Sequence, residues 1–254
     1  MASALISGVT QFISNDEIIV SSPGKDDLDL LRKNFGISTT TSNVDVIKKS
    51  KFVFLAIKPN ILGVVLDEIR SHINIDTVLI SIVAGANLNS IENKTPESSK
   101  VIRAMPNTPV SIGKGITALC ANSNTSNSEK EFVDNMFSSV GSCIWLSEGS
   151  FDLYTSVFGS GPAYVFYLSE ILIEATEDLD IEPEERQSLI AELIKGASSL
   201  ILENMEHPAS LRGKVTSPGG VTEKAIQILD KKEVKESFLE ALHEATKKSK
   251  ELGR

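Results

Sequence analysis

Residues 52–59 read Phe-Val-Phe-Leu-Ala-Ile-Lys-Pro, a flat apolar run of strand length that ends in a lysine and a proline. A strand without polar alternation is typical of a parallel sheet, whose two faces are both covered by helices. Similar runs rich in Val, Ile and Phe occur at residues 17–21, 78–83, 101–105, 116–120 and 143–146. Amphipathic segments stand between them at 26–34, 44–49, 61–71 and 130–139. This alternation predicts βαβ units and a mostly parallel sheet.

The strand signals stop near residue 150, and the rest of the chain has helical periodicity. Apolar residues recur at three- and four-residue spacing over 164–178 and 184–203, and further helical patterns cover 221–229 and 234–252. Pro183 suits the first turn of the second of these helices. We therefore expect two domains, an α/β domain at residues 1–149 and an all-α domain at residues 150–254.

Composition excludes several classes of protein. The chain has 254 residues, of which 41% are hydrophobic and 23% charged, which is ordinary for a soluble globular protein. The formal net charge of −9 argues against a general binder of nucleic acid or of anionic membranes. Cys120 and Cys143 are too few for a disulfide framework, and the three histidines lie far apart, so we expect reduced thiols and no metal site. The first basic residue is Lys25, so no signal peptide is recognisable, and the default location is the cytoplasm.

The first residues depart from the pattern of a doubly wound sheet. Residues 1–8 read Met-Ala-Ser-Ala-Leu-Ile-Ser-Gly, a helical stretch with no strand before it, and the sequence contains no Gly-x-Gly-x-x-Gly. A doubly wound sheet normally starts with a central strand and a glycine-rich turn. We therefore expect the first strand and its turn to be absent from this chain, which would expose the edges of neighbouring strands.

Polar or small residues follow three predicted strands, and ligands bind at such strand ends in open α/β sheets. Residues 21–25 read Ser-Ser-Pro-Gly-Lys, whose hydroxyl and basic groups favour the 2′-phosphate of NADP over the free hydroxyl of NAD, although an ordinary turn can have the same sequence. Lys58 ends the next strand, and Ala84-Gly85-Ala86 follow another, where small residues let a flat ligand approach the backbone.

The densest local signal is Val215-Thr-Ser-Pro-Gly-Gly-Val-Thr222, which runs directly into a helical pattern. Two glycines at a helix start expose backbone N–H groups at the positive end of the helix dipole, a site for a carboxylate or phosphate. Simple N-capping would need only one Ser or Thr, so the cluster favours a binding site. In contrast, Phe158-Gly-Ser-Gly-Pro-Ala-Tyr164 is not Gly-x-Ser-x-Gly and predicts a Gly-Pro helix start.

Five stretches together resemble pyrroline-5-carboxylate reductase, the NAD(P)H-dependent enzyme family of the last step of proline synthesis. They are Phe54-Leu-Ala-Ile-Lys-Pro59, Ser81-Ile-Val-Ala-Gly85, Arg103-Ala-Met-Pro-Asn-Thr-Pro109, Phe158-Gly-Ser-Gly-Pro-Ala-Tyr164 and His207-Pro-Ala-Ser-Leu-Arg-Gly-Lys-Val-Thr-Ser-Pro-Gly-Gly-Val-Thr222. They keep the family's order and spacing. The resemblance implies a Rossmann-like dinucleotide-binding domain, without its first strand here, and an all-α dimerisation domain.

The resemblance also implies a site for NADPH, or NADH, formed by residues that follow the strands. These residues are Ser21, Ser22, Lys25, Asn43, Ala56, Lys58, Pro59, Ala84 and Gly85. Ser21 and Ser22 fall at the 2′-phosphate end, where Lys25 would supply the counter-charge, and Asn43 falls at the adenosine. Ala56, Lys58 and Pro59 would line the dinucleotide near the nicotinamide.

The substrate implied by the resemblance is 1-pyrroline-5-carboxylate. Ser217, Gly219 and Gly220 match the loop that binds its carboxylate, and Thr222, the catalytic residue, would hydrogen-bond the ring nitrogen. Hydride would pass from C4 of the nicotinamide to C5 of the cyclic imine, with the protein supplying position and electrostatics. The helical domains would pair across a twofold axis, and the dimers typically assemble into decamers.

Two other functions remain open on the sequence. A hydroxyacid or prephenate type of dehydrogenase on the same plan would use a Lys or His of the helical domain as acid or base, and His207 is the obvious candidate. A family member without the glycine-rich turn would instead oligomerise without binding cofactor. A lost N-terminal segment could have carried an organelle signal, which leaves a mitochondrial location open.

Overall fold

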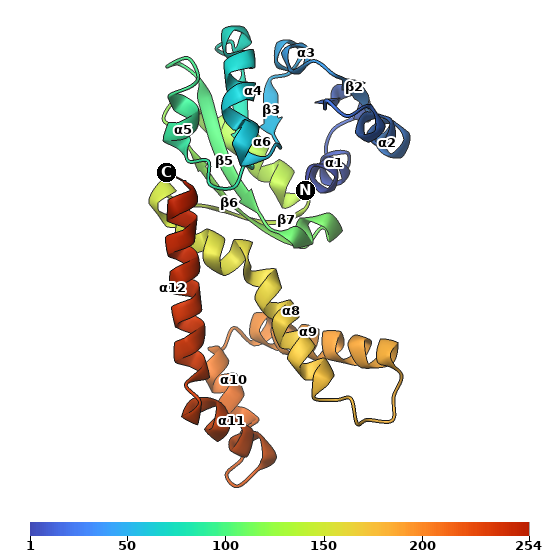
Figure 1. Ribbon diagram of the computed structural model, residues 1–254, viewed down its shortest axis with the longest axis vertical. Helices are drawn as coiled ribbons and strands as arrows, with labels where there is room; N and C mark the ends of the chain where they lie inside the picture. The colour runs from blue at the N-terminus through green and yellow to red at the C-terminus, as the bar shows by residue number, and fades with distance from the viewer. Residues whose placement is uncertain (254) are drawn as a thin grey trace. The chain divides into compact units, whose positions relative to one another are not determined.

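The computed structural model describes residues 1–253 and divides the chain into two compact units. One unit contains Met1–Pro162 together with the residues from Ala245 onward, and the other contains Ala163–Glu244. The first holds every strand in the described part of the chain, and the second is helical (Figure 1). An α/β part with a Rossmann-like sheet followed by a helical part confirms the predicted fold class, whereas the boundary at residue 150 stays a prediction.

The first unit is built on a five-stranded sheet in which the strands lie in chain order. They are β3 (Phe52–Leu55), β4 (Val78–Ser81), β5 (Lys100–Pro106), β6 (Gly115–Ala121) and β7 (Gly141–Trp145). All neighbouring pairs are parallel except β5 and β6. Only a short 3-10 turn, Thr108–Ile112, joins those two strands, and a connection of that length cannot make a parallel crossover.

Two further strands form a separate parallel pair. They are β1 (Ile19–Ser21) and β2 (Ser38–Thr40), joined by α2 (Lys25–Phe35). The strand β2 was not predicted from the sequence, because Ser-Thr-Thr contains no apolar residue. Within residues 1–253, no strand joins this pair to β3.

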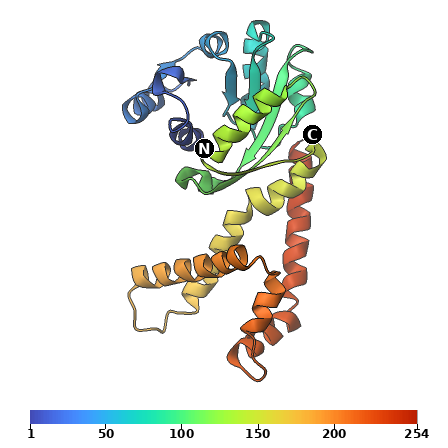
Figure 2. The same ribbon diagram turned by 180° about the vertical axis from the view of Figure 1, so that it is seen from behind.

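Helices cover both faces of the five-stranded sheet (Figures 1 and 2). On one face, α1 (Ala2–Val9) and α6 (Asn127–Ser138) contribute to a core with Val78 and Ile80 of β4. On the other, α3 (Asn43–Lys49), α4 (Leu62–Ile69) and α5 (Leu88–Glu92) contribute to a core around Leu79 of the same strand. Consecutive residues of a strand face opposite sides of its sheet, so one apolar strand serves two cores.

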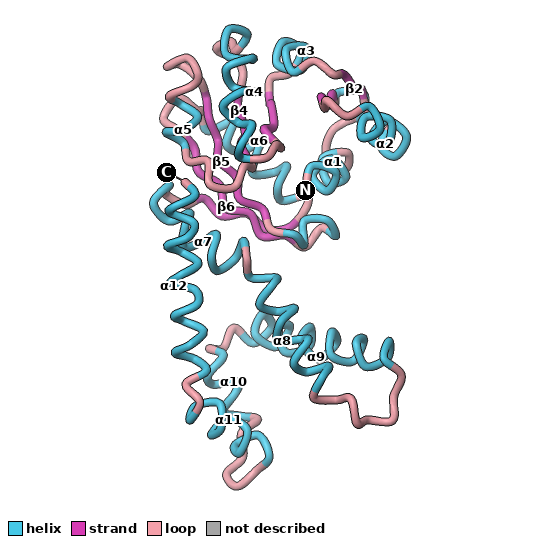
Figure 3. The backbone as a smooth tube through the Cα atoms, in the orientation of Figure 1, coloured by secondary structure: helices cyan, strands magenta, loops and turns pink. Residues whose placement is uncertain are grey.

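The rest of the chain is helical (Figure 3). After α7 (Phe151–Tyr154) and a π-helical turn at Thr155–Gly159 come α8 (Gly161–Glu174), α9 (Pro183–Asn204), α10 (Pro208–Lys214), α11 (Val221–Lys231) and α12 (Val234–Leu252). The Gly-Pro start of α8 and the first-turn Pro183 of α9 are confirmed. None of the helices in the described residues combines the length and the hydropathy that a membrane span requires.

Candidate functional site

A cleft of about 390 Å³ lies where β3, β4 and β5 end, beside the first residues of α1. Parallel strands bring their carboxyl ends to one edge of the sheet, so residues distant in sequence meet there. The lining residues are Met1, Ala2, Ala56, Ile57, Lys58, Ile82, Ala84, Met105 and Pro106. Three of the predicted cofactor residues, Ala56, Lys58 and Ala84, are therefore brought together. Pro59 does not line the cleft and starts a 3-10 turn instead.

The chemistry of this cleft suits a phosphorylated nucleotide. The first N–H groups of α1 have no partner within the helix and carry the positive end of its dipole. Ala56 and Ala84 keep the backbone accessible, and Lys58 supplies an exposed positive charge. A Cβ on Gly8 would lie 1.7 Å from Cγ1 of Val140, so only glycine at this position lets α1 pack closely against Val140. The role of Gly8 could not be predicted from the sequence, because it depends on a contact with a residue that is distant in sequence.

Hydrogen bonds connect the residues predicted for the adenosine end. The hydroxyl of Ser21, at the end of β1, donates to Oδ1 of Asn43 over 2.8 Å, and Nδ2 of Asn43 donates to Oε2 of Glu68 over 2.8 Å. The Ser22 hydroxyl accepts from the Gly24 N–H over 3.3 Å. The structure thus brings Ser21 and Asn43 together. Glu68 had no signal in the sequence, because it is one carboxylate among several on helix surfaces.

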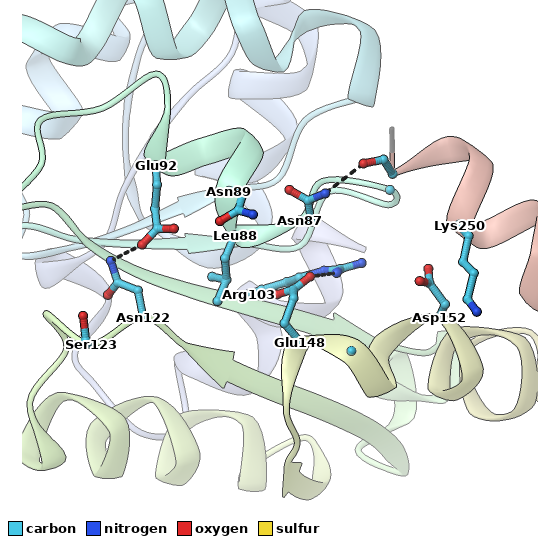
Figure 4. A pocket seen from close by; sticks show the side chains of 13 residues that line it. Asn87, Leu88, Asn89, Glu92, Arg103, Asn122, Ser123, Glu148, Asp152 and Lys250 are labelled. Carbon is cyan, nitrogen blue, oxygen red and sulfur yellow. Dashed lines mark hydrogen bonds and ion pairs between the residues drawn. The ribbon is translucent and has the colours of Figure 1, made fainter.

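Gly85 has a different environment from its neighbour Ala84. Its φ of +77° favours glycine, and a Cβ there would lie 2.7 Å from the carbonyl oxygen of Leu252 in α12. Gly85 lines a second pocket, of about 610 Å³, which also contains Arg103 and Glu148 (Figure 4).

The polar groups around Arg103 have partners within the chain. Its side chain, which is almost fully buried, forms an ion pair with Glu148, and its guanidinium lies 4.5 Å from the centre of the Phe151 ring. The Cys120 thiol donates to the other oxygen of Glu148 over 3.1 Å, and burial, together with that carboxylate, raises the pKa of Cys120. These contacts indicate a structural role. Across residues 1–253, no cluster of His, Cys, Asp and Glu side chains could hold a metal ion.

In the second unit, the predicted substrate residues surround the start of α11. Gly219 has a φ of +73°, and a Cβ on Gly220 would lie 2.9 Å from the carbonyl oxygen of Ser217, so both positions require glycine. The Gly219 N–H donates to the carboxylate of Glu223 over 2.8 Å. Ser217 and Thr222 are exposed. This loop therefore already binds one carboxylate, and it leaves two hydroxyl groups open to a ligand.

His207, the candidate acid or base of the alternative dehydrogenase, caps a helix. Its Nδ1 accepts a hydrogen bond of 3.2 Å from the N–H of Ala209 in the first turn of α10. The ring nitrogen used in this way is not free for proton transfer in the observed arrangement.

Comparisons with known proteins agree with this architecture. Residues 148–252 match the family profile "Pyrroline-5-carboxylate reductase dimerisation", and residues 1–85 match "NADP oxidoreductase coenzyme F420-dependent". The chain is 36% identical to a pyrroline-5-carboxylate reductase of Synechocystis sp., over 94% of this chain and 89% of that protein. The structure of a pyrroline-5-carboxylate reductase from Coxiella burnetii matches with a TM-score of 0.91 at 33% identity, over 100% of this chain and 95% of the other. A Plasmodium falciparum pyrroline carboxylate reductase with NADP bound matches with a TM-score of 0.90 at 30% identity, over 99% and 94%.

Proposed function

Because the chain belongs to the pyrroline-5-carboxylate reductase family, we propose that it reduces 1-pyrroline-5-carboxylate to L-proline with NADPH, or NADH, as hydride donor. This reaction is the last step of proline biosynthesis, and it makes the protein an oxidoreductase acting on a CH–NH bond. The observation that carries the proposal is the Gly219 N–H, which donates to a carboxylate at the start of α11. The proposed substrate carries a carboxylate of the same kind.

The residues of the cleft at β3–β5 would hold the cofactor. The N-terminal turn of α1 carries positive charge toward a pyrophosphate, Lys58 would lie near the nicotinamide, and the small side chains of Ala56 and Ala84 leave room for flat rings. Ser21, Ser22, Lys25 and Asn43 would meet the adenosine end. When bound, the nicotinamide supplies the hydride that reduces C5 of the cyclic imine.

The loop before α11 would hold the substrate. Its backbone N–H groups and the helix dipole favour the carboxylate of 1-pyrroline-5-carboxylate, and Ser217 adds a hydroxyl. The Thr222 hydroxyl would hydrogen-bond the ring nitrogen and so fix the face that the imine carbon presents. A hydroxyl that donates to the imine nitrogen makes C5 more electrophilic, so Thr222 acts as a donor or proton relay and not as a strong acid.

The helices of the second unit support assembly into at least a dimer. Between Ala163 and Glu244, Ile190 is the one buried hydrophobic side chain of the described residues. Many large apolar side chains there are about half exposed, among them Phe166, Leu168, Leu193, Leu200 and Phe238. A surface of this kind requires a partner, and the matching family profile is named for dimerisation.

Two finer proposals follow from the resemblance. We expect the dimers to assemble into decamers, which sedimentation equilibrium can measure directly. We also expect the protein in the cytoplasm, which cell fractionation can test. Isolated dimers would contradict the decamer, and a location in an organelle would contradict the cytoplasmic proposal. Neither result would bear on the proposed reaction.

The reductase activity is tested by NADPH oxidation with 1-pyrroline-5-carboxylate as substrate. The wild-type chain should reduce the substrate. Thr222→Val lacks the hydroxyl, so its kcat/KM should be about 10- to 100-fold lower, whereas Thr222→Ser should keep most of the activity. His207→Asn retains a helix-capping side chain and should leave the rate nearly unchanged. No turnover by the wild type would favour the oligomerising, non-enzymatic alternative, and a large loss in His207→Asn would favour the other type of dehydrogenase.

A further inference from the structure

Three polar side chains from three elements form one chain of hydrogen bonds at the adenosine end of the proposed cofactor site. Ser21 lies at the end of β1, Asn43 is the first residue of α3, and Glu68 lies in α4. The bonds from Ser21 to Asn43 and from Asn43 to Glu68 are both 2.8 Å long. Ser21 and Asn43 are half-buried, and Glu68 is exposed.

Glu68 fixes the direction of both hydrogen bonds. A carboxylate has only acceptors, so Asn43 must turn its NH₂ group to Glu68 and its carbonyl group to Ser21. The carbonyl can only accept, so the single hydroxyl proton of Ser21 is committed to Asn43. The Ser21 oxygen can therefore accept a hydrogen bond from a ligand through its lone pairs, but it has no proton left to donate to one.

This direction distinguishes the two forms of the cofactor. A free ribose 2′-hydroxyl has a proton that the Ser21 oxygen can accept. A 2′-phosphate carries nearly two negative charges and offers mainly acceptors, so it would meet a lone pair of Ser21 and, beyond Asn43, the charge of Glu68. Lys25 and the Ser22 hydroxyl act in the opposite sense, since both can donate to a phosphate.

We propose that Glu68 is a specificity-determining residue, which shifts the preference of the adenosine site toward a ribose with a free 2′-hydroxyl. It acts through Asn43 and Ser21 and touches no reacting atom. The inference rests on the proposed function, which places the cofactor's ribose beside Ser21.

The test uses two fragments of the cofactor, AMP and 2′,5′-ADP, which differ by the 2′-phosphate alone. Their dissociation constants are measured by calorimetry on the full chain for the wild type, Glu68→Gln and Asp67→Asn. A glutamine at position 68 can donate, so Asn43 can reverse and free the Ser21 proton for a phosphate. Asp67 lies on the same helix and pairs with Lys94, so Asp67→Asn removes an equal charge without touching Asn43.

We expect the ratio of the AMP to the 2′,5′-ADP dissociation constant to rise about threefold to tenfold in Glu68→Gln, the effect of one hydrogen bond. In Asp67→Asn it should change less than about twofold, because the shift comes from hydrogen-bond direction and not from charge at a distance. An equal rise in both variants, or no rise in either, overturns the proposal.

Turnover of 1-pyrroline-5-carboxylate, measured on the same samples, separates this inference from the proposed function. A wild-type chain that reduces the substrate but binds neither fragment would overturn the placement of the ribose, and the role of Glu68 with it. A chain that fails to reduce the substrate but shows the expected shift in Glu68→Gln would support the role of Glu68 and overturn the reductase activity.

Discussion

Gly85 and Leu252, far apart in the sequence, lie so close together that a Cβ on Gly85 would stand 2.7 Å from the carbonyl oxygen of Leu252. The neighbouring Asn87 donates a hydrogen bond of 2.8 Å to the carbonyl oxygen of Gly253 (Figure 4). The loop after β4 is therefore hydrogen-bonded to the end of α12, next to Ala84, which lines the proposed cofactor cleft. This contact should stabilise the α/β unit.

Gly85→Ala tests that contact. The substitution combines a left-handed backbone conformation with a clash against a backbone oxygen, and we expect it to lower the free energy of unfolding by about 2–4 kcal/mol. Gly113→Ala is the matched control, because Gly113 has a φ of +69° with open space around it. This variant should lower the free energy of unfolding by only about 1 kcal/mol. If urea denaturation shows equal losses of unfolding free energy in the two variants, the close approach of Leu252 contributes nothing to the effect of Gly85→Ala.

Glu223→Ala should strengthen substrate binding. The Glu223 carboxylate accepts the Gly219 N–H that the substrate carboxylate would use, so the two compete for it. Removal of the competitor should lower KM for 1-pyrroline-5-carboxylate about twofold to tenfold, with a smaller effect on kcat. Asp230→Asn, at the other end of α11, controls for loss of charge. A KM that rises in Glu223→Ala would mean that Glu223 supports the loop and does not compete with the substrate.

The folded protein should lose a specific contribution to stability in acid. Burial alone would raise the pKa of Glu129, but hydrogen bonds from Lys100 and Ser126 outweigh it and hold the pKa below its ordinary value. This stabilisation is present above the unfolded pKa of about 4.3 and is lost as the pH falls through the lower, folded pKa.

Glu129→Gln measures that contribution. The variant should be about 1–3 kcal/mol less stable than the wild type at pH 7. The difference should shrink steadily below about pH 4, where Glu129 itself becomes protonated. Unfolding curves at several pH values provide the comparison, and a difference that stays constant down to pH 2 would contradict the assigned role.

The two thiols should be inert in the folded chain. Burial raises the pKa of Cys143 to about 11, and burial also raises that of Cys120. At pH 8, only about a thousandth of Cys143 would be thiolate, the reactive form. Ellman's reagent should therefore label neither thiol until denaturant is added, after which both react. Rapid labelling of the native protein would disprove this description of the core.

Local signals in the sequence were sufficient for most of the fold. Flat apolar runs predicted β3 to β7, because a strand covered on both faces needs no polar alternation. The polar strand β2, Ser38–Thr40, escaped detection, since its place is set by pairing with β1 and not by burial. The antiparallel direction of β6 depends on a short connection that the sequence analysis did not interpret.

The candidate site divides in the same way. Ala56, Lys58 and Ala84 were found because strand ends meet at one edge of a sheet, and the paired glycines 219 and 220 because their sequence is unusual at a helix start. Gly8 and Glu68 were missed, because each acts through a residue far away in the chain, Val140 and Asn43 respectively. Such contacts exist only in the folded protein and leave no local pattern.

Direct hydride transfer from the cofactor to the imine carbon can be followed with an isotope label. The wild-type chain is given 1-pyrroline-5-carboxylate and NADPH deuterated at C4 of the nicotinamide, on the face that is transferred, and the product is analysed by mass spectrometry and NMR. We expect L-proline with one deuterium, located at C5. Proline without deuterium, or no proline from a folded chain that binds the cofactor, would contradict it.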